Sequence, residues 1–309
     1  MDPNISGLEF LAVALGLSLW LGYYVGKYLA HLVKGTPRPF EGALSKVEHA
    51  IFRVAGIDPK RGMDWKEYVV ALVVLDAVFA VFTYVVLIAQ GSLPYNPRGL
   101  PGFSWDLSLN TASSFITNTN LQHYSGDSSL TVFSQLVLML CQFVAPASAV
   151  AVGVAFLRPF LHKGANLGNF YADFVRATVS LLLPISFVGA LFLMALGVPQ
   201  TFSPLLHTGS IAGGPQSFVV GPLAGQVAIM QLGQNGGGYY GANLAMPFAN
   251  PNGLTNLTVI VLMWIIPMGF LFAYGECFGR KRGRVLLAAV LIPVAVLFAY
   301  ALSQPTGTA

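Results

Sequence analysis

Two short polar stretches interrupt a chain that is otherwise strongly apolar. The first runs from 117 to 122 and the second from 234 to 239. Their residues that could hold an ion are Thr117, Asn118, Thr119, Asn120 and Gln122, and then Gln234, Asn235, Gly236, Gly237 and Gly238. Hydroxyls, amide oxygens and backbone carbonyls of this kind can replace the hydration shell of a small cation. The two stretches therefore predict a cation pathway built from neutral oxygen atoms.

Each stretch also has a simpler interpretation. A glycine triplet is often a flexible loop or a site of close helix packing, and Thr-Asn pairs are common in turns and caps. Both stretches, however, lie between long apolar runs. A bilayer tolerates non-helical backbone only where it is buried in protein or lines a water-filled cavity. This pairing favours the cation pathway over a membrane scaffold whose polar loops only pack.

The composition is that of a membrane protein. Only 9% of the residues are charged, 55% are hydrophobic and the mean hydropathy is +0.68, whereas soluble domains carry roughly a quarter charged residues. Asp, Glu, Lys and Arg are all missing from 177 to 275. Cys141 and Cys277 lie in apolar runs, and neither they nor the scattered histidines show the spacing of a metal site.

Apolar run length predicts six spanning helices, since about 20 residues cross the hydrocarbon core. The expected ranges are 6–33, 66–90, 130–158, 171–197, 254–276 and 284–303. The first range lacks a basic leader and a small-residue cleavage site, so we expect a spanning helix there and not a signal peptide. The fold class that follows is an all-α membrane protein.

The basic residues predict the orientation. Eight Lys and Arg residues lie in 27–66, three in 158–176 and four in 280–284, and only Arg98 lies on the other side. Cytoplasmic loops carry such an excess, so the N-terminus is expected outside. Both polar stretches would then enter the membrane from the outside. The net charge of +4 reflects this topology and does not indicate nucleic acid.

The order of segments predicts two parallel repeats. In each, a spanning helix is followed by a short helix, a polar re-entrant stretch and a second spanning helix. Asp106 is the expected N-cap of the first short helix, which would end near Phe115, and Pro222 stands near the start of the second. The expected divisions are an N-terminal helix at 1–33, a cytoplasmic loop at 34–65, channel-like repeats at 66–158 and 159–283, and the opening helix of a third repeat at 284–309.

Three further features have open interpretations. The apolar residues of 44–54 predict an amphipathic helix at the membrane surface or on a partner. Asp76 is an acid well inside an apolar run, where it could relay or couple ions or could serve a structural role. His123 is expected at the mouth of the pathway and not as a metal ligand.

Longer motifs in the chain resemble the KdpA family, the potassium-binding subunits of bacterial and archaeal Kdp transporters. They are LPGFSWD at 100–106, NTN at 118–120 with Gln122 and YSG at 124–126, NGGG at 235–238, PFANP at 247–251, GIDP at 56–59 and MDWK at 63–66. The resemblance runs nearly from end to end of the chain.

This resemblance implies a fold, a function and partners. The family has four channel-like repeats around one pseudo-fourfold pore, of which this chain would supply two. Potassium is the transported ion, and no cofactor is implied. ATP would be hydrolysed by a KdpB-like P-type subunit in the cell membrane, with KdpC-like and KdpF-like subunits and the missing third and fourth repeats as further partners. The chain itself carries no phosphorylation-site signature or Walker-type loop, so it is expected to have no catalytic residues.

The chain departs from the family pattern at three positions near the expected filters. Leu121 stands where Trp is expected, His123 where Ser is expected, and Gln234 where Thr is expected. A Thr hydroxyl can coordinate an ion, whereas Gln carries a longer amide. Affinity or selectivity for potassium could therefore differ from the family norm.

The resemblance leaves the completeness of the pore open. Either the chain is a fragment, or a second polypeptide supplies the other repeats. Two copies could also close a pore by two-fold symmetry, although the sixth helix argues against this. The favoured function is the potassium-selecting subunit of an ATP-driven importer, and the alternative is a passive or ion-coupled channel of the same superfamily.

Overall fold

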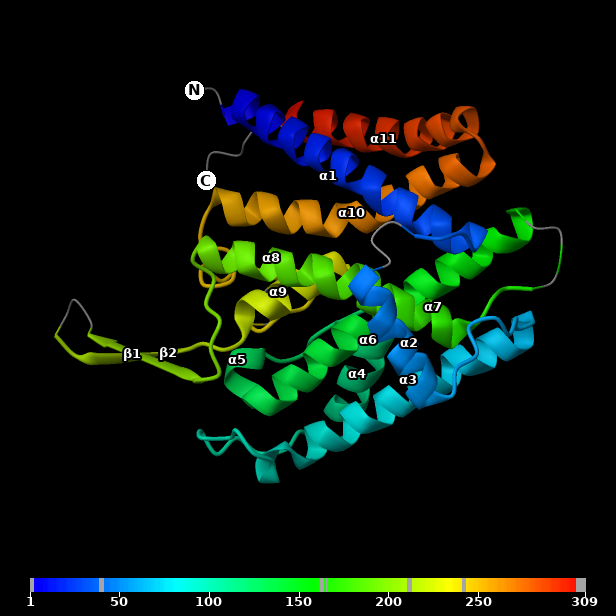
Figure 1. Ribbon diagram of the computed structural model, residues 1–309. Coiled ribbons are helices and arrows are strands. Elements are labelled where there is room, and N and C mark those ends of the chain that lie inside the picture. The colour runs from blue at the N-terminus through cyan, green and yellow to red at the C-terminus, as the bar shows by residue number, and fades with distance from the viewer. Residues whose placement is uncertain are drawn as a thin grey trace.

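The chain folds into a mostly helical structure with one small hairpin (Figure 1). The computed structural model describes residues 3–38, 42–161, 164, 166–209, 213–240 and 243–303. Its helices are α1 (Pro3–Lys34), α2 (Gly42–Ala55), α3 (Trp65–Ala89), η1 (Gln90–Ser92), α4 (Trp105–Ile116), α5 (Gly126–Ser129), α6 (Val132–Leu161), α7 (Phe170–Ala177), η2 (Thr178–Leu182), α8 (Leu183–Ala195), α9 (Leu223–Leu232), α10 (Gly253–Phe278) and α11 (Arg280–Ser303). The strands are β1 (Leu205–Gly209) and β2 (Pro215–Val219).

Six helical stretches among the described residues are long and apolar enough to cross a membrane. They are Gly7–Lys34, Trp65–Ser92, Val132–Leu161, Phe170–Ala195, Gly253–Phe278 and Arg280–Ala301. All six predicted spans are confirmed, and their ends differ from the predictions by a few residues. Such a set makes the chain a multi-pass membrane protein. Residues 304–309 of the expected opening segment of a third repeat lie outside the described residues.

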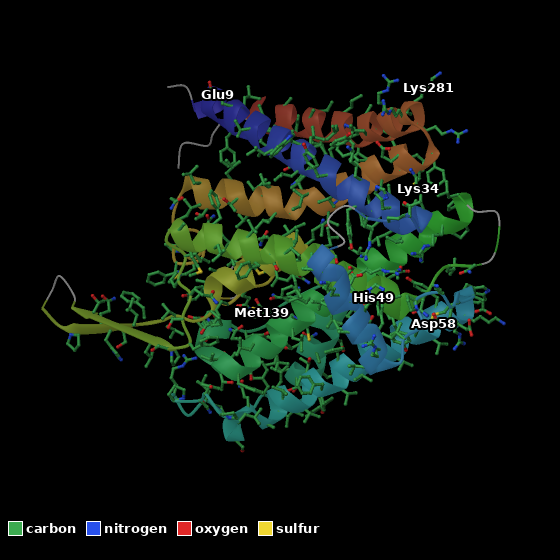
Figure 2. All side chains as sticks on the ribbon, in the orientation of Figure 1. Glu9, Lys34, His49, Asp58, Met139 and Lys281 are labelled. Atoms are coloured by element: carbon green, nitrogen blue, oxygen red, sulfur yellow. The ribbon has the colours of Figure 1, made fainter. Side chains whose placement is uncertain are left out.

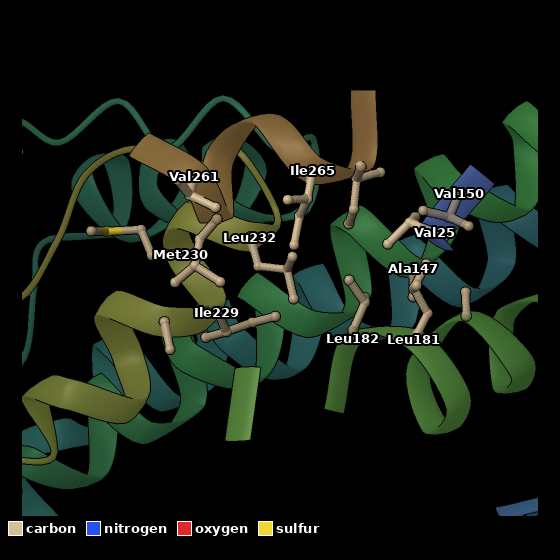
Figure 3. Close-up of a cluster of buried hydrophobic side chains, with 14 of the residues drawn as sticks. Val25, Ala147, Val150, Leu181, Leu182, Ile229, Met230, Leu232, Val261 and Ile265 are labelled. Atoms are coloured by element: carbon tan, nitrogen blue, oxygen red, sulfur yellow. The ribbon is translucent and has the colours of Figure 1, made fainter. Parts of the chain in front are cut away.

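Helix α6 lies at the centre of the packing. About two-thirds (67%) of its most apolar segment is buried, against 17% for α3 and 0% for α11. The main apolar cluster joins it to α1, η2, α9 and α10. Figure 3 shows this junction, with Ala147 and Val150 of α6 among side chains from the other four elements. The short helix α9 is therefore buried in the protein, and all of its residues except Gly225 are themselves buried.

Small residues allow α1 and α10 to pack closely. A β-carbon at Gly26 would lie 2.5 Å from the Cβ of Phe272, and one at Gly22 would lie 2.6 Å from the Cβ of Met268. On the facing helix, a β-carbon at Gly269 would lie 2.6 Å from Val25. Glycines spaced four apart let membrane helices approach until their backbones touch. This contact fixes α10 against α1.

A buried ion pair ties four elements together at one end of the bundle. Arg158 on α6 contacts both carboxylate oxygens of Asp173 on α7, at 2.5 and 2.7 Å. The hydroxyl of Tyr68 on α3 donates to the same carboxylate at 3.2 Å. Arg158 also donates to the carbonyl of Leu32 on α1 at 3.2 Å. Because the charges are paired and hydrogen-bonded, they can be buried.

The amphipathic helix in the first loop packs on this chain itself. Phe52 of α2 is buried against Val175 and Val179, and Glu48 is buried in a two-point ion pair with Arg38 at 2.6 and 2.7 Å. The hydroxyl of Ser180 also donates to Glu48. The predicted helix is confirmed, and part of its apolar face packs on α7 and η2 of the same chain.

A two-stranded hairpin projects from the bundle between α8 and α9 (Figure 1). Its antiparallel register pairs Leu205 with Val219 and Gly209 with Pro215. Its sequence carries no strict apolar alternation, and the expectation of a purely helical chain did not include it.

Replacing Gly26 with leucine tests the close packing of α1 on α10. The new side chain would overlap Phe272 and the carbonyl of Gly269, and overpacking of this kind costs about 1–3 kcal/mol or more. We expect a lower unfolding temperature in detergent, measured by a thermal shift assay on the purified membrane protein.

Gly16→Leu on the same helix is the matched control, because a β-carbon there has no neighbour within 4 Å. An equal loss of stability in both variants would show that glycine content, and not the α1–α10 contact, matters.

Candidate cation-binding site

The two polar stretches lie side by side, although more than a hundred residues separate them in the sequence. The side-chain amide of Asn118 donates to the carbonyl of Gly233 at 3.0 Å. In return, the amide of Asn235 donates to the side-chain oxygen of Asn118. The Gln122 amide donates to the carbonyl of Gly238 at 3.1 Å. These bonds join the two stretches into one polar unit.

Helix α4 ends in a turn that reverses the chain. Thr117 closes the helix with φ −85° and ψ 7°, and Asn118 follows in the left-handed region with φ 62°. The N–H groups of Asn118 and Thr119 then donate to the carbonyls of Phe115 and Ser114, at 3.4 and 2.9 Å. This pair of bonds is a Schellman motif, which satisfies the last carbonyls of a helix.

Helix α9 ends in the same motif. Gly233 closes it with φ −81° and ψ −3°, and Gln234 takes the left-handed position with φ 54°. The N–H groups of Gln234 and Asn235 donate to the carbonyls of Gln231 and Met230, at 3.1 and 2.9 Å. The two polar stretches therefore begin with matching backbone geometry.

Left-handed backbone continues beyond both turns. Asn120 has φ 48°, and Gly236, Gly237 and Gly238 have φ 75°, 71° and 144°. A β-carbon at Gly237 would lie 3.0 Å from the carbonyl oxygen of Asn120. Glycine is needed here both for its dihedral freedom and for the close approach of the first stretch. Non-regular backbone of this kind clusters at ligand sites.

The first stretch is anchored to its own helix. Ser114 accepts from the N–H of Asn120 at 2.9 Å through its carbonyl and from the N–H of Leu121 at 2.7 Å through its hydroxyl. Leu121 itself is exposed, as is His123. The side chains at two of the three departures from the family pattern thus point away from the packed interior of the site.

The second stretch is anchored to α6. The Gln135 amide donates to the carbonyl of Tyr239 at 3.3 Å, and its oxygen accepts from Gln226 on α9 at 3.3 Å. Burial raises the pKa of Tyr239 to about 12, so its phenol stays protonated at neutral pH. That phenol donates to the carbonyl of Val220 at 2.9 Å. Two helices thereby hold the glycine-rich backbone in place.

A hollow of about 500 Å³ opens beside both stretches. It is lined by Asn118, Thr119, Gln231, Gln234, Asn235, Gly236, Asn243, Leu244, Ala245, Asn250, Asn256, Val259, Ile260 and Met263. Among the described residues that line it, none is acidic or basic. The C-terminal ends of α4 and α9 meet here, and each carries a partial negative charge. The hollow offers neutral oxygen atoms in a field that favours a cation.

Several buried polar atoms at the site lack hydrogen bonds within the described chain. They are both amide atoms of Asn120 and the side-chain oxygens of Gln122, Gln226 and Asn235. Unpaired buried polar atoms are rare because each costs free energy. Their clustering around the two stretches leaves oxygen atoms free for a ligand or water. In the described part of the chain, no group of His, Cys, Asp or Glu is placed to hold a metal ion.

One face of α4 is polar and uncovered. Asp106, Asn110, Ser113 and Thr117 are all exposed and follow the helical spacing. Asp106 stands in the first turn, because the helix begins at Trp105 with Ser104 in the N-cap position. The expectation that Asp106 is the N-cap was therefore wrong by two residues.

The structure brings the ten predicted site residues into one region. Asn120, Asn235 and Gly238 are buried, Asn118, Gln122, Gly236 and Gly237 are half-buried, and Thr117, Thr119 and Gln234 are exposed. The Gln234 side chain differs from those of Asn118 and Gln122 in its partner. Its amide donates to the carbonyl of Met263 on α10 at 3.0 Å, outside both stretches.

Other residues of interest lie apart from this region or were not predicted. Asp76 on α3 accepts from Ser148 on α6 at 3.2 Å, a contact with a polar group on a neighbouring helix of the kind that the structural interpretation expects. The supporting residues Ser114, Gln135 and Gln226 carry no sequence signal that marks them, since a buried polar side chain in a helix has no fixed spacing.

Comparisons with known proteins show which family the chain is similar to. A family model described as "Potassium-transporting ATPase A subunit" matches residues 12–308. The chain is 39% identical to the potassium-transporting ATPase potassium-binding subunit of Caldanaerobacter subterraneus, over 97% of this chain and 53% of that protein. It is 40% identical to the same subunit of Serratia proteamaculans, over 97% of this chain and 54% of that protein. The chain thus spans about half the length of the curated relatives it matches.

Alanine at two neighbouring glycines tests the close approach of the stretches. Both Gly236 and Gly237 have positive φ, so alanine costs about 1–2 kcal/mol at either. A β-carbon at Gly237 also presses on Asn120 and Gln122, whereas one at Gly236 has only Asn243 at 3.8 Å. We expect Gly237→Ala to lower the unfolding temperature more than Gly236→Ala in the same thermal shift assay. Equal shifts would contradict the packing of the two stretches against each other.

Proposed function

Because the chain belongs to the family of potassium-transporting ATPase A subunits, we propose that it selects and passes potassium for an ATP-driven importer. The ion would be held at the two polar stretches, which act as filter loops. The ligands would come from Thr117, Asn118, Thr119, Asn120 and Gln122 and from Gln234, Asn235, Gly236, Gly237 and Gly238. The chain would not hydrolyse ATP, and a KdpB-like P-type subunit would do so.

The observation that carries this proposal is the pairing of two left-handed, charge-free backbone stretches at the ends of two short helices. A ring of neutral oxygens suits potassium, which sheds its water readily when carbonyl and hydroxyl oxygens replace it. Carboxylates would hold a cation more strongly but would slow its release. The negative ends of α4 and α9 supply attraction without a fixed charge.

We further propose that the two stretches are re-entrant loops of two parallel repeats. The repeats would be 66–158 and 159–283, preceded by the helix 1–33 and the loop 34–65, with 284–309 opening a third. Pro146 in α6 and Pro267 in α10 stand at the same distance from their helix starts, which supports the correspondence. The exposed polar face of α4 would then be covered by third and fourth repeats around a common pore, with KdpC-like and KdpF-like subunits nearby.

The orientation proposed from the basic residues is an external N-terminus in a cell membrane. Figure 2 shows Lys34, Asp58 and Lys281 toward one end of the helices and Glu9 toward the other. An excess of Lys and Arg marks the cytoplasmic side. The hairpin projects from the opposite end of the bundle (Figure 1), which would be the external side. In this orientation, potassium would enter the filter loops from outside.

Arginine at Gln122 tests the filter. The amide of Gln122 donates to the carbonyl of Gly238, so Gln122→Arg places a fixed positive charge at the ion path. Repulsion should raise the potassium concentration for half-maximal uptake by about tenfold or more. Uptake by the assembled transporter in cells is the measurement.

Gln122→Met is the control for that experiment, because it removes the same hydrogen bond without adding a charge. A smaller rise in half-saturation is expected for methionine. If arginine left half-saturation unchanged in a normally assembled transporter, the filter assignment would be wrong.

Cysteine labelling in intact cells tests the orientation. Lys46 on α2 and Thr208 on β1 are both exposed, and a background without Cys141 and Cys277 removes native thiols. An impermeant thiol reagent should label Thr208→Cys and spare Lys46→Cys until the cells are opened. The reverse pattern would invert the proposed direction of ion entry.

A further inference from the structure

Gln234 stands in a backbone conformation that its residue type disfavours. Its φ of 54° is left-handed, and it occupies the position after the helix cap that glycine or asparagine usually fills. In the matching turn of the first stretch, the residue is Asn118. A long side chain at such a position persists only where the surrounding structure holds it.

The side chain of Gln234 finds its partner in a defect of α10. Proline has no N–H, so Pro267 leaves the carbonyl of Met263, four residues earlier, without its helical donor. The Gln234 amide donates to that carbonyl at 3.0 Å. The bond therefore satisfies a carbonyl that the helix cannot satisfy itself, at the edge of the hollow that both residues line.

The first stretch uses the same device. There, the amide of Asn118 donates at 3.0 Å to the carbonyl of Gly233, at the end of α9. Each left-handed residue thus reaches from its own turn to a carbonyl of another element, at the end of α9 for Asn118 and within α10 for Gln234. The first stretch is held to the second, and the second is held to α10.

We propose that Gln234 is a positioning residue that sets the place of the second filter loop from the kink in α10, and that its side chain is not an ion ligand. This inference rests on the proposed function and changes one of its assignments. The amide that could face an ion is held toward the Met263 carbonyl. A threonine at 234 would be too short to make this bond, so this chain positions its loop by a contact that the family pattern does not predict.

A double-mutant cycle separates positioning from coordination. Gln234→Met keeps the side-chain length and removes the donor, whereas Pro267→Ala returns an N–H to the Met263 carbonyl. We expect Gln234→Met to raise the half-saturation for potassium about fivefold to tenfold and to weaken discrimination against sodium, with a smaller change in maximal uptake. Pro267→Ala gives the Met263 carbonyl its own helical donor and so weakens the same bond from the other side, and we expect it to raise half-saturation by about twofold to threefold. The double variant should be no worse than Gln234→Met alone, because both changes act on one bond.

Gln216→Met, on the exposed strand β2, is the matched control and should change nothing. The measurement is uptake by the assembled transporter over a range of external potassium, with and without sodium. A double variant no worse than Gln234→Met alone supports positioning, since the loss of an ion ligand would add to a separate change in the helix. No effect of Gln234→Met, or effects of the two changes that add in the double variant, overturns it.

Two outcomes remain distinct from these. If Gln234→Met does not assemble, Pro267→Ala decides: a raised half-saturation supports the inference, and an unchanged one overturns it. If the unaltered transporter does not discriminate potassium from sodium, the proposed function fails and the hydrogen bond remains as a purely structural contact. The contribution of this hydrogen bond to stability is then measured from the unfolding temperatures of the unaltered protein, the two single variants and the double variant.

Discussion

The structure depends on how two non-helical polar stretches satisfy their backbone groups inside an apolar bundle. Hydrocarbon offers no hydrogen bonds, so every such group needs a partner within the protein. Each stretch satisfies its N–H groups at the end of its own short helix, and side chains of the first stretch and its flank supply donors for carbonyls in and beside the second: Asn118 donates to Gly233, Gln122 to Gly238, and Ser125 to Tyr240 at 2.9 Å. These contacts join the two stretches into one unit.

The polar unit is connected to the apolar packing of the surrounding helices. Helix α6 carries Gln135, which donates to the carbonyl of Tyr239 in the second stretch, and also forms the centre of the apolar cluster. Glycines bring α1 against α10, and α10 in turn presents the Met263 carbonyl to Gln234. A displacement of α10 would therefore be felt at the second stretch and, through Asn118, at the first. The packing of α1 on α10 is therefore connected, through the Met263–Gln234 hydrogen bond, to the geometry of the polar stretches.

The sequence predicts the parts of this structure that depend on local chemistry. Run length locates the six spanning helices, because the bilayer thickness sets how many apolar residues are needed. Residue type and position together locate the polar stretches, because Asn, Thr and Gly between long apolar runs favour an ion pathway over a simple turn. The start of α4 was misplaced by two residues, since Ser104 and Asp106 are both acceptable near a helix start.

What the sequence could not predict depends on contacts between distant residues. The partner of α2 is its own chain, because Phe52 and Glu48 find Val175 and Ser180 far along the sequence. From its residue type alone, Gln234 is predicted to be one more oxygen ligand for the ion, because its contact with Met263 cannot be seen in the sequence. Only the fold brings it to a carbonyl that Pro267 has freed. A residue type indicates which bonds are possible, and the packing of α10 decides which of them forms.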